Sequence, residues 1–138
     1  MILSKWFTKA KESILRGKVN VIDYPVKVML LDETYSPDQE NHETLSDVVG
    51  EITGEGYSVG GKEVQNKYID HDVRSVILKG DDVEWENSTI SARYGVLYVD
   101  HGTKPLLGFY DFGNIKSSNN GIFRIRFNQN GILKMTVE

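Results

Sequence analysis

The sequence predicts an all-β protein, an antiparallel β-sandwich of the jelly-roll or immunoglobulin-like type with a short N-terminal amphipathic helix. Short apolar runs recur at intervals of roughly 8–12 residues, separated by turn-forming residues, as in sandwiches and barrels. Within residues 91–99, aromatic and β-branched side chains alternate along the chain, which suits a pleated strand with a buried face. Before Gly17, by contrast, apolar residues recur at the three- and four-residue spacing of an amphipathic helix.

Length and composition limit the number of domains and the classes of protein to which the chain can belong. The 138 residues suffice for one domain with its own core. The chain contains no cysteine, which excludes a disulfide framework and a thiolate zinc site. No apolar run approaches the roughly 20 residues that cross a bilayer, and the N-terminus lacks an apolar segment of signal-peptide length. We therefore expect no membrane as a partner.

The charge is unevenly distributed. Residues 1–18 carry five bases and one acid, a net charge of +4, whereas the remainder carries 11 bases and 19 acids, a net charge of −8. A basic arm ahead of an acidic body is a common docking arrangement. The acidic body repels phosphate, so we expect no nucleic acid as its partner.

Residues 1–20 are interpreted as a basic amphipathic helical arm, and residues 21–138 as a single β-sandwich domain. Ser4 is the expected N-cap, and the helix is expected to end near Gly17. Three roles stay open: packing on the chain's own body, insertion into a neighbouring subunit, or lying on a membrane surface, where one short helix anchors only weakly. For the partner role, the arm offers an apolar face of Trp6, Phe7 and Ile14 and a polar face of Lys5, Lys9 and Lys11.

The first half of the body mixes one clear strand with polar connections. Residues 24–31 form that strand, and Pro25 near its start indicates an edge or an entry point. A polar loop over residues 32–41 and a short helix over 42–49, ended by Gly50, follow. Further strands are predicted over residues 51–57, 62–69 and 73–78, separated by turns at 60–61, 70–72 and 79–82.

The second half is read as two hairpins. Residues 91–99 and 106–112 form a central hairpin around the turn at 100–105, followed by a loop over 113–121. Residues 122–127 alternate, with aromatic and aliphatic residues on one face and Arg124 and Arg126 on the other. The Asn-Gly pair that ends residues 128–131 is typical of a hairpin turn, so residues 132–137 are predicted to return beside 122–127.

The patterns that suggest chemistry are weak. The glycines of residues 54–61 miss the dinucleotide-binding spacing and lack a following helix, so a turn is favoured. Residues 70–72, Asp-His-Asp, hold metal-ligand types, yet neighbours on a strand point to opposite sides. The acids of the first loop lack the spacing of a calcium-binding helix-loop-helix, although adventitious calcium stays open. These acids are Asp32, Glu33, Asp38 and Glu40.

Catalytic constellations are also missing from the sequence. Asp82, Glu84 and Glu86 alternate with Val83 and Trp85, which a half-exposed strand requires without any paired-carboxylate chemistry. No nucleophile motif is present, and two arginines on an acidic body give little support for nucleic-acid stacking. We therefore predict a protein that is not an enzyme, with no catalytic residue, no cofactor and no resident metal.

As a set, several segments between residues 26 and 137 resemble small β-rich virion proteins of tailed bacteriophages. The shared features are strand ends, turns and core aromatics, and the N-terminal arm lies outside them. The segments are residues 28–31 with the Tyr-Ser-Pro-Asp loop, 51–61, 82–90, 92–94, 105–109, 111–113 and 131–134.

The resemblance implies a structural component of a phage particle, most directly a capsid decoration protein or a head or tail component. Such a protein is expected to be assembled in the host bacterial cytoplasm, to reside in the virion, and to contact identical copies and other capsid or tail proteins. The alternative is a carbohydrate- or receptor-binding sandwich, in which Trp85 or exposed tyrosines stack on a host surface glycan.

Overall fold

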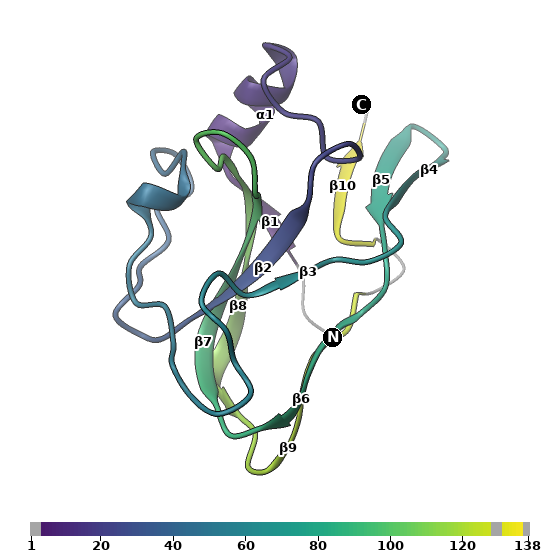
Figure 1. The fold of residues 1–138 in the computed structure, drawn as a ribbon. Coiled ribbons are helices and arrows are strands. Elements are labelled where there is room, and N and C mark those ends of the chain that lie inside the picture. The colour runs from purple at the N-terminus through teal and green to yellow at the C-terminus, as the bar shows by residue number, and fades with distance from the viewer. Residues whose placement is uncertain (1–3, 128–130, 137–138) are drawn as a thin grey trace.

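A computed structural model describes residues 4–127 and 131–136. Its central antiparallel sheet has the strand order β1-β8-β7-β2-β3 (Figure 1). The strands of this sheet are β1 (Ser4–Trp6), β2 (Val26–Leu31), β3 (Lys62–Glu63), β7 (Ser91–Val99) and β8 (Leu106–Ser117). A second sheet, in the order β10-β5-β4, contains β4 (Tyr68–Asp72), β5 (Ser75–Lys79) and β10 (Leu133–Thr136). A two-stranded sheet pairs β6 (Val83–Ser88) with β9 (Gly121–Ile125).

The central sheet is buried on both faces. Along β2, Val26, Val28 and Leu30 enter a large apolar cluster shared with the two smaller sheets. Met29 and Leu31 enter a second cluster on the opposite face. This alternation follows from the two-residue period of a strand. The predicted all-β, antiparallel, sandwich-like fold is therefore confirmed, with a second apolar layer added outside the central sheet.

The N-terminal segment is built into the domain. Helix α1 (Thr8–Leu15) begins later than predicted, because residues 4–6 form β1 and pair with β8. Phe7 between them is 0% exposed, and its backbone N–H donates to the Leu107 carbonyl at 3.0 Å. Ser4 is not the helix cap, since its hydroxyl donates to the Ile132 carbonyl. The helix expected to include residues 4–6 is thus corrected, because these residues form β1, and Phe7 packs on the chain's own body, the first of the three roles left open.

The central hairpin is confirmed, and its second strand is longer than predicted. Strand β8 continues to Ser117 through much of the predicted loop at residues 113–121. Its register with β7 jumps from Tyr94↔Asp111 to Ala92↔Lys116, so four residues of β8 bulge out. A bulge of this kind bends a strand and re-aims its side chains.

The predicted C-terminal hairpin is wrong, although both of its strands exist. Strand β9 pairs with β6, and β10 pairs with β5. The predicted turn at residues 128–131 lies outside the described residues except for Gly131. In these pairings Phe123 and Ile125 of β9 and Leu133 of β10 enter the apolar cluster against the central sheet, whereas an isolated two-stranded ribbon is only marginally stable in water.

Several predictions in the first half need correction. Residues 51–57 form no strand and make only isolated bridges through Glu51 and Glu55. The helix predicted over 42–49 is a single 3-10 turn, η1 (Leu45–Asp47). The turn predicted at 70–72 belongs to β4, and the chain reverses instead at Val73 and Arg74, where Arg74 has a φ of 57°. Within the described residues, no helix is long and apolar enough to cross a membrane.

Candidate functional site

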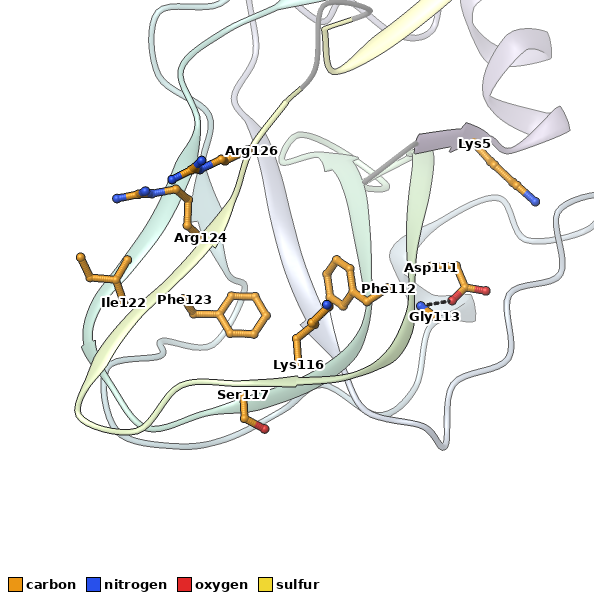
Figure 2. Close-up of a pocket in the computed structure, with 10 residues that line it drawn as sticks. All are labelled: Lys5, Asp111, Phe112, Gly113, Lys116, Ser117, Ile122, Phe123, Arg124 and Arg126. Atoms are coloured by element: carbon orange, nitrogen blue, oxygen red, sulfur yellow. Dashed lines mark hydrogen bonds between the residues drawn. The ribbon is translucent and has the colours of Figure 1, made fainter. Parts of the chain in front are cut away.

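A groove of about 760 Å³ lies between the end of β8 and strand β9 (Figure 2). Strand β9, with its partner β6, lies at the end of the molecule away from α1 (Figure 1). The lining of the groove comes from β8, from β9 with the adjoining Arg126, and from β1, which is distant from the other two in the sequence. The described lining residues are Lys5, Asp111, Phe112, Gly113, Lys116, Ser117, Ile122, Phe123, Arg124 and Arg126.

The bulge in β8 creates one wall of the groove. Gly113 lies in the bulge with a φ of 80°, a conformation that glycine adopts without steric cost. The bulged residues Phe112 to Ile115 stand opposite Arg93 alone in the register between β7 and β8. The strand therefore turns away from the central sheet here, and the space beside it stays open.

Strand β9 forms the other wall through its alternation. Phe123 and Ile125 face the core and are 6% and 0% exposed, as the sequence predicted. Ile122, Arg124 and Arg126 are on the outer face, and Figure 2 shows the two arginines side by side, directed away from Phe112. One strand thus contributes both an apolar inner row and a cationic outer row.

The floor of the groove is apolar and aromatic. The rings of Phe112 and Phe123 point toward one another across it, 6.1 Å apart and inclined at 60° (Figure 2). Phe123 in turn packs edge-on against Trp85 at 6.0 Å. Edge-to-face contacts of this kind hold aromatic rings in a defined orientation. The floor is consequently part of the domain core rather than a mobile surface.

The lining carries four cationic side chains and one carboxylate, on a chain whose net charge is −4. The carboxylate, Asp111, forms an ion pair with Arg93, and this contact lowers the pKa of Asp111 below its usual range. Arg124 pairs with Glu84 at 2.6 Å. Within the described residues, Lys116 and Arg126 have no ion-pair partner. The groove therefore has a surplus of positive charge.

Backbone groups are also open along this groove. Strand β9 has one neighbour in its sheet, β6, so its other edge has no strand partner among the described strands. On the facing wall, β1 pairs only with residues 108–110 of β8. An unpaired strand edge presents a row of N–H and C=O groups that can accept a further strand.

The predicted partner-binding residues are only partly brought together. Lys5 lines the groove, but Phe7 lies in the core and is not available to a partner, which corrects that assignment. Trp6 is half-buried and its indole N–H donates to the Lys134 carbonyl at 3.0 Å. The other three are surface or half-buried residues of α1 outside the groove, and their partner role stays a prediction: Lys9, Lys11 and Ile14.

The sequence does not reveal the groove, although its two walls are consecutive strands, because residues 113–121 are predicted to form a loop whereas β8 continues to Ser117. The sequence places Arg124 and Arg126 on the outer face of a strand and predicts a loop at Lys116. The only signal available was the alternation of arginine with Phe123 and Ile125. It marks one wall and says nothing of the other.

Trp85 is not a sugar-stacking residue. It is 3% exposed and packs between the rings of Tyr57 and Phe123. A stacking platform must present its ring face to solvent. This burial removes Trp85 from the carbohydrate-binding alternative, which is left with exposed tyrosines such as Tyr68.

The glycine-rich segment at residues 54–61 is anchored to the central sheet rather than open to a ligand. The Tyr57 hydroxyl donates to Glu51 at 2.7 Å and accepts the Leu30 N–H at 3.2 Å. The Gly60 N–H donates to the same carboxylate at 2.7 Å. Burial is the main cause that raises the pKa of Tyr57 above its usual value. The segment is therefore a structural connection.

The acids singled out as metal ligands are engaged in local contacts. Asp70 pairs with Lys79 at 3.0 Å, and this hydrogen bond lowers the pKa of Asp70. Asp32 accepts hydrogen bonds from Thr34, and Asp38 accepts them from Glu40 and Asn41. Among the residues that the structure describes, no group of three or more His, Asp or Glu side chains is placed to hold a metal ion.

Comparison with known proteins adds no relative. No family model, no curated protein and no solved structure matches the chain. The geometry of the groove is therefore the basis for assigning a function.

Proposed function

We propose that this protein is a non-enzymatic structural subunit of a bacteriophage particle, which works through protein–protein contacts made at the groove between β8 and β9. One observation carries the proposal. On an acidic chain, an aromatic floor, a surplus of cations and an unpaired strand edge meet in one open groove. These are the components of a protein docking surface.

The charge distribution supports a protein partner. A cationic groove on a chain of net charge −4 attracts an acidic partner surface and orients it during encounter. The acidic remainder of the surface disfavours association in other orientations. An assembly built from many identical copies requires each copy to associate in one defined orientation.

The assignment to a phage particle is supported by the resemblance to small tailed-phage virion proteins. In that setting the protein contacts identical copies and other capsid or tail proteins, resides in the virion and is assembled in the host bacterial cytoplasm. The carbohydrate- or receptor-binding alternative is less well supported, because Trp85 is buried.

Immunogold electron microscopy of purified particles tests the assignment. Antibodies raised against the purified chain are applied to particles isolated from cultures that produce it. We expect gold at a fixed position on the head, the connector or the tail. Label that is absent from particles, with the protein recovered only in the particle-free fraction, would overturn the assignment.

Deletion of residues 1–18 is a poor test of assembly for this protein. It removes β1 from the edge of the central sheet and Phe7 from the core, so loss of assembly would reflect loss of fold. Surface substitutions in the groove, such as Lys116→Glu, leave the core in place.

A further inference from the structure

We propose that the groove binds an extended acidic segment of a partner protein, which adds as a third strand to the free edge of β9. The proposal rests on the proposed function and specifies the partner's chemistry at the same site. The segment has acidic residues alternating with apolar ones. It lies between β9 and the bulged end of β8.

The strand edges make room for such an addition. The β6–β9 sheet has two strands, and two-stranded sheets are only marginally stable in water. The facing wall, Phe112 to Ile115, is the bulged part of β8 and lies outside its paired register with β7. An added strand completes backbone hydrogen bonds along β9, as in other cases of strand addition.

Strand β6, the existing partner of β9, shows which side chains pack opposite those of β9. On β6, Glu84 lies opposite Arg124 and forms an ion pair with it, while Trp85 lies opposite Phe123 and packs against its ring. A strand on the free edge meets the same two rows of β9 from the other side. Its acidic residues then face Arg124 and Arg126, and its apolar residues face the floor formed by Phe112 and Phe123.

Positive charge is available for that strand. Arg126 and Lys116 have no ion-pair partner among the described residues, and both line the groove. The single acid of the lining, Asp111, already pairs with Arg93. An incoming carboxylate therefore meets cations whose charge is not neutralised by neighbours.

The same groove suits single-stranded nucleic acid poorly. Phe112 and Phe123 are 8% and 6% exposed, so neither ring offers a free face for a base. Non-specific single-strand binding depends on such stacking platforms together with a long cationic track. The net charge of −4 adds repulsion.

Fluorescence anisotropy with a labelled synthetic peptide, Glu-Val-Glu-Phe-Glu-Val, tests the proposal on the full chain. We expect saturable binding that weakens at least tenfold in Arg126→Glu. The matched control is Arg74→Glu, which makes the same charge change in the exposed β4–β5 turn and leaves affinity unchanged. A peptide with lysine in place of each glutamate is expected not to bind.

Backbone methylation separates strand addition from charge attraction. Methylating every second amide nitrogen removes the donors along one edge of the peptide and keeps its charge. We expect at least a tenfold loss of affinity when the methylated edge is the one facing β9. A peptide methylated at the alternate set of amides, on its opposite edge, is expected to keep its affinity. Equal affinity of both methylated peptides, equal binding to Arg126→Glu, or stronger binding of an oligothymidylate would each overturn the proposal. These readouts do not depend on where the protein lies in a particle.

Discussion

Gly61, in the turn predicted at residues 60–61, is required because two backbone segments approach each other closely there. A Cβ atom at Gly61 would lie 1.8 Å from the Val28 carbonyl oxygen, and the residue has a φ of 84°. Both the space and the backbone conformation therefore require glycine. The segment before β3 lies directly against the backbone of β2 at this point.

Replacing Gly61 with alanine is expected to lower the free energy of unfolding by more than about 3 kcal/mol, since the backbone must shift to admit the methyl group. Gly102→Ala is the matched control, because Gly102 has a φ of 61° with nothing within 4 Å of its Cβ position. Its cost is limited to about 1–2 kcal/mol of backbone strain. Urea unfolding of both variants makes the comparison, and equal losses would contradict the close approach.

Asp100 links β2 to the β7–β8 turn. Its carboxylate lies 2.9 Å from the Lys27 ammonium and 3.6 Å from that of Lys104. The hydrogen bond from Lys27 is the main cause that lowers the pKa of Asp100 below its usual 3.8. The stabilisation is therefore present above pH 3.8 and is lost as the pH falls through the lower pKa of the folded state.

Asp100→Asn is expected to reduce stability at pH 7 by about 1 kcal/mol, because the ion pair is only partly screened from solvent. The difference from the unmodified chain should shrink as the pH falls from 5 toward 2, where the native carboxyl group is also protonated. Urea titrations across this range provide the measurement. Glu86→Gln, on the exposed face of β6, is the control for neutralising one surface carboxylate at pH 7. A constant difference at all pH values would contradict the assignment.

At the level of elements, the N-terminal segment shows that residues with a helical apolar spacing can form a strand where a sheet edge is available. The apolar spacing correctly indicated a helix over Thr8–Leu15 but extended it too far toward the N-terminus. Residues 4–6 join the sheet instead, because the edge of β8 offers backbone partners that an isolated first helical turn lacks. The helix is then held against the sheet by Phe7 and Ala10.

Phe7→Ala is expected to lower the free energy of unfolding by about 3–5 kcal/mol, the usual loss for a fully buried phenylalanine. Phe7 is 0% exposed and its ring lies 5.1 Å from that of Phe109. Leu15→Ala, at a position 88% exposed on the same helix, is expected to change stability by less than about 0.5 kcal/mol. Denaturant unfolding distinguishes the two. Comparable small effects would mean that the N-terminal segment does not contribute to the core.

The C-terminal strands show the limit of local pattern. Alternation correctly located β9 and β10, and the Asn-Gly pair suggested that they pair with each other. The structure pairs β9 with β6 and β10 with β5, segments roughly 40 or more residues earlier. Because a turn signal reports only on its own few residues, it carries no information about which distant edge is free to take a strand.

Across the whole molecule, two apolar clusters share the strands of one sheet. On β7, Leu97 and Val99 face the cluster between the sheets, and Val96 and Tyr98 face the cluster beneath α1. Trp6 packs against both clusters, whereas Trp85 belongs only to the first. Loss of the central sheet therefore exposes both clusters together.

Two single-tryptophan chains test this cooperativity. Trp6→Phe leaves Trp85 as the fluorescent probe, and Trp85→Phe leaves Trp6. In each chain, we expect the fluorescence transition to coincide with the far-ultraviolet circular dichroism transition in urea, as for one cooperative unit. A Trp6 signal that changes at clearly lower urea than the circular dichroism would indicate that the N-terminal segment unfolds separately. Comparing probes within each chain removes the effect of the substitution itself.

The sequence alone determined the fold class, most strand positions and the burial of alternate residues along them. These follow from the two-residue period of a strand and from turn chemistry, which are local properties. Tertiary structure alone decided the partners of β1, β9 and β10, the docking of Phe7, the burial of Trp85 and the placement of Lys5 beside the groove. Those outcomes depend on which distant edges and apolar faces remain uncovered once the central sheet has formed. Which strand covers each edge depends on all the segments of the chain together, so the pattern of one segment does not predict it.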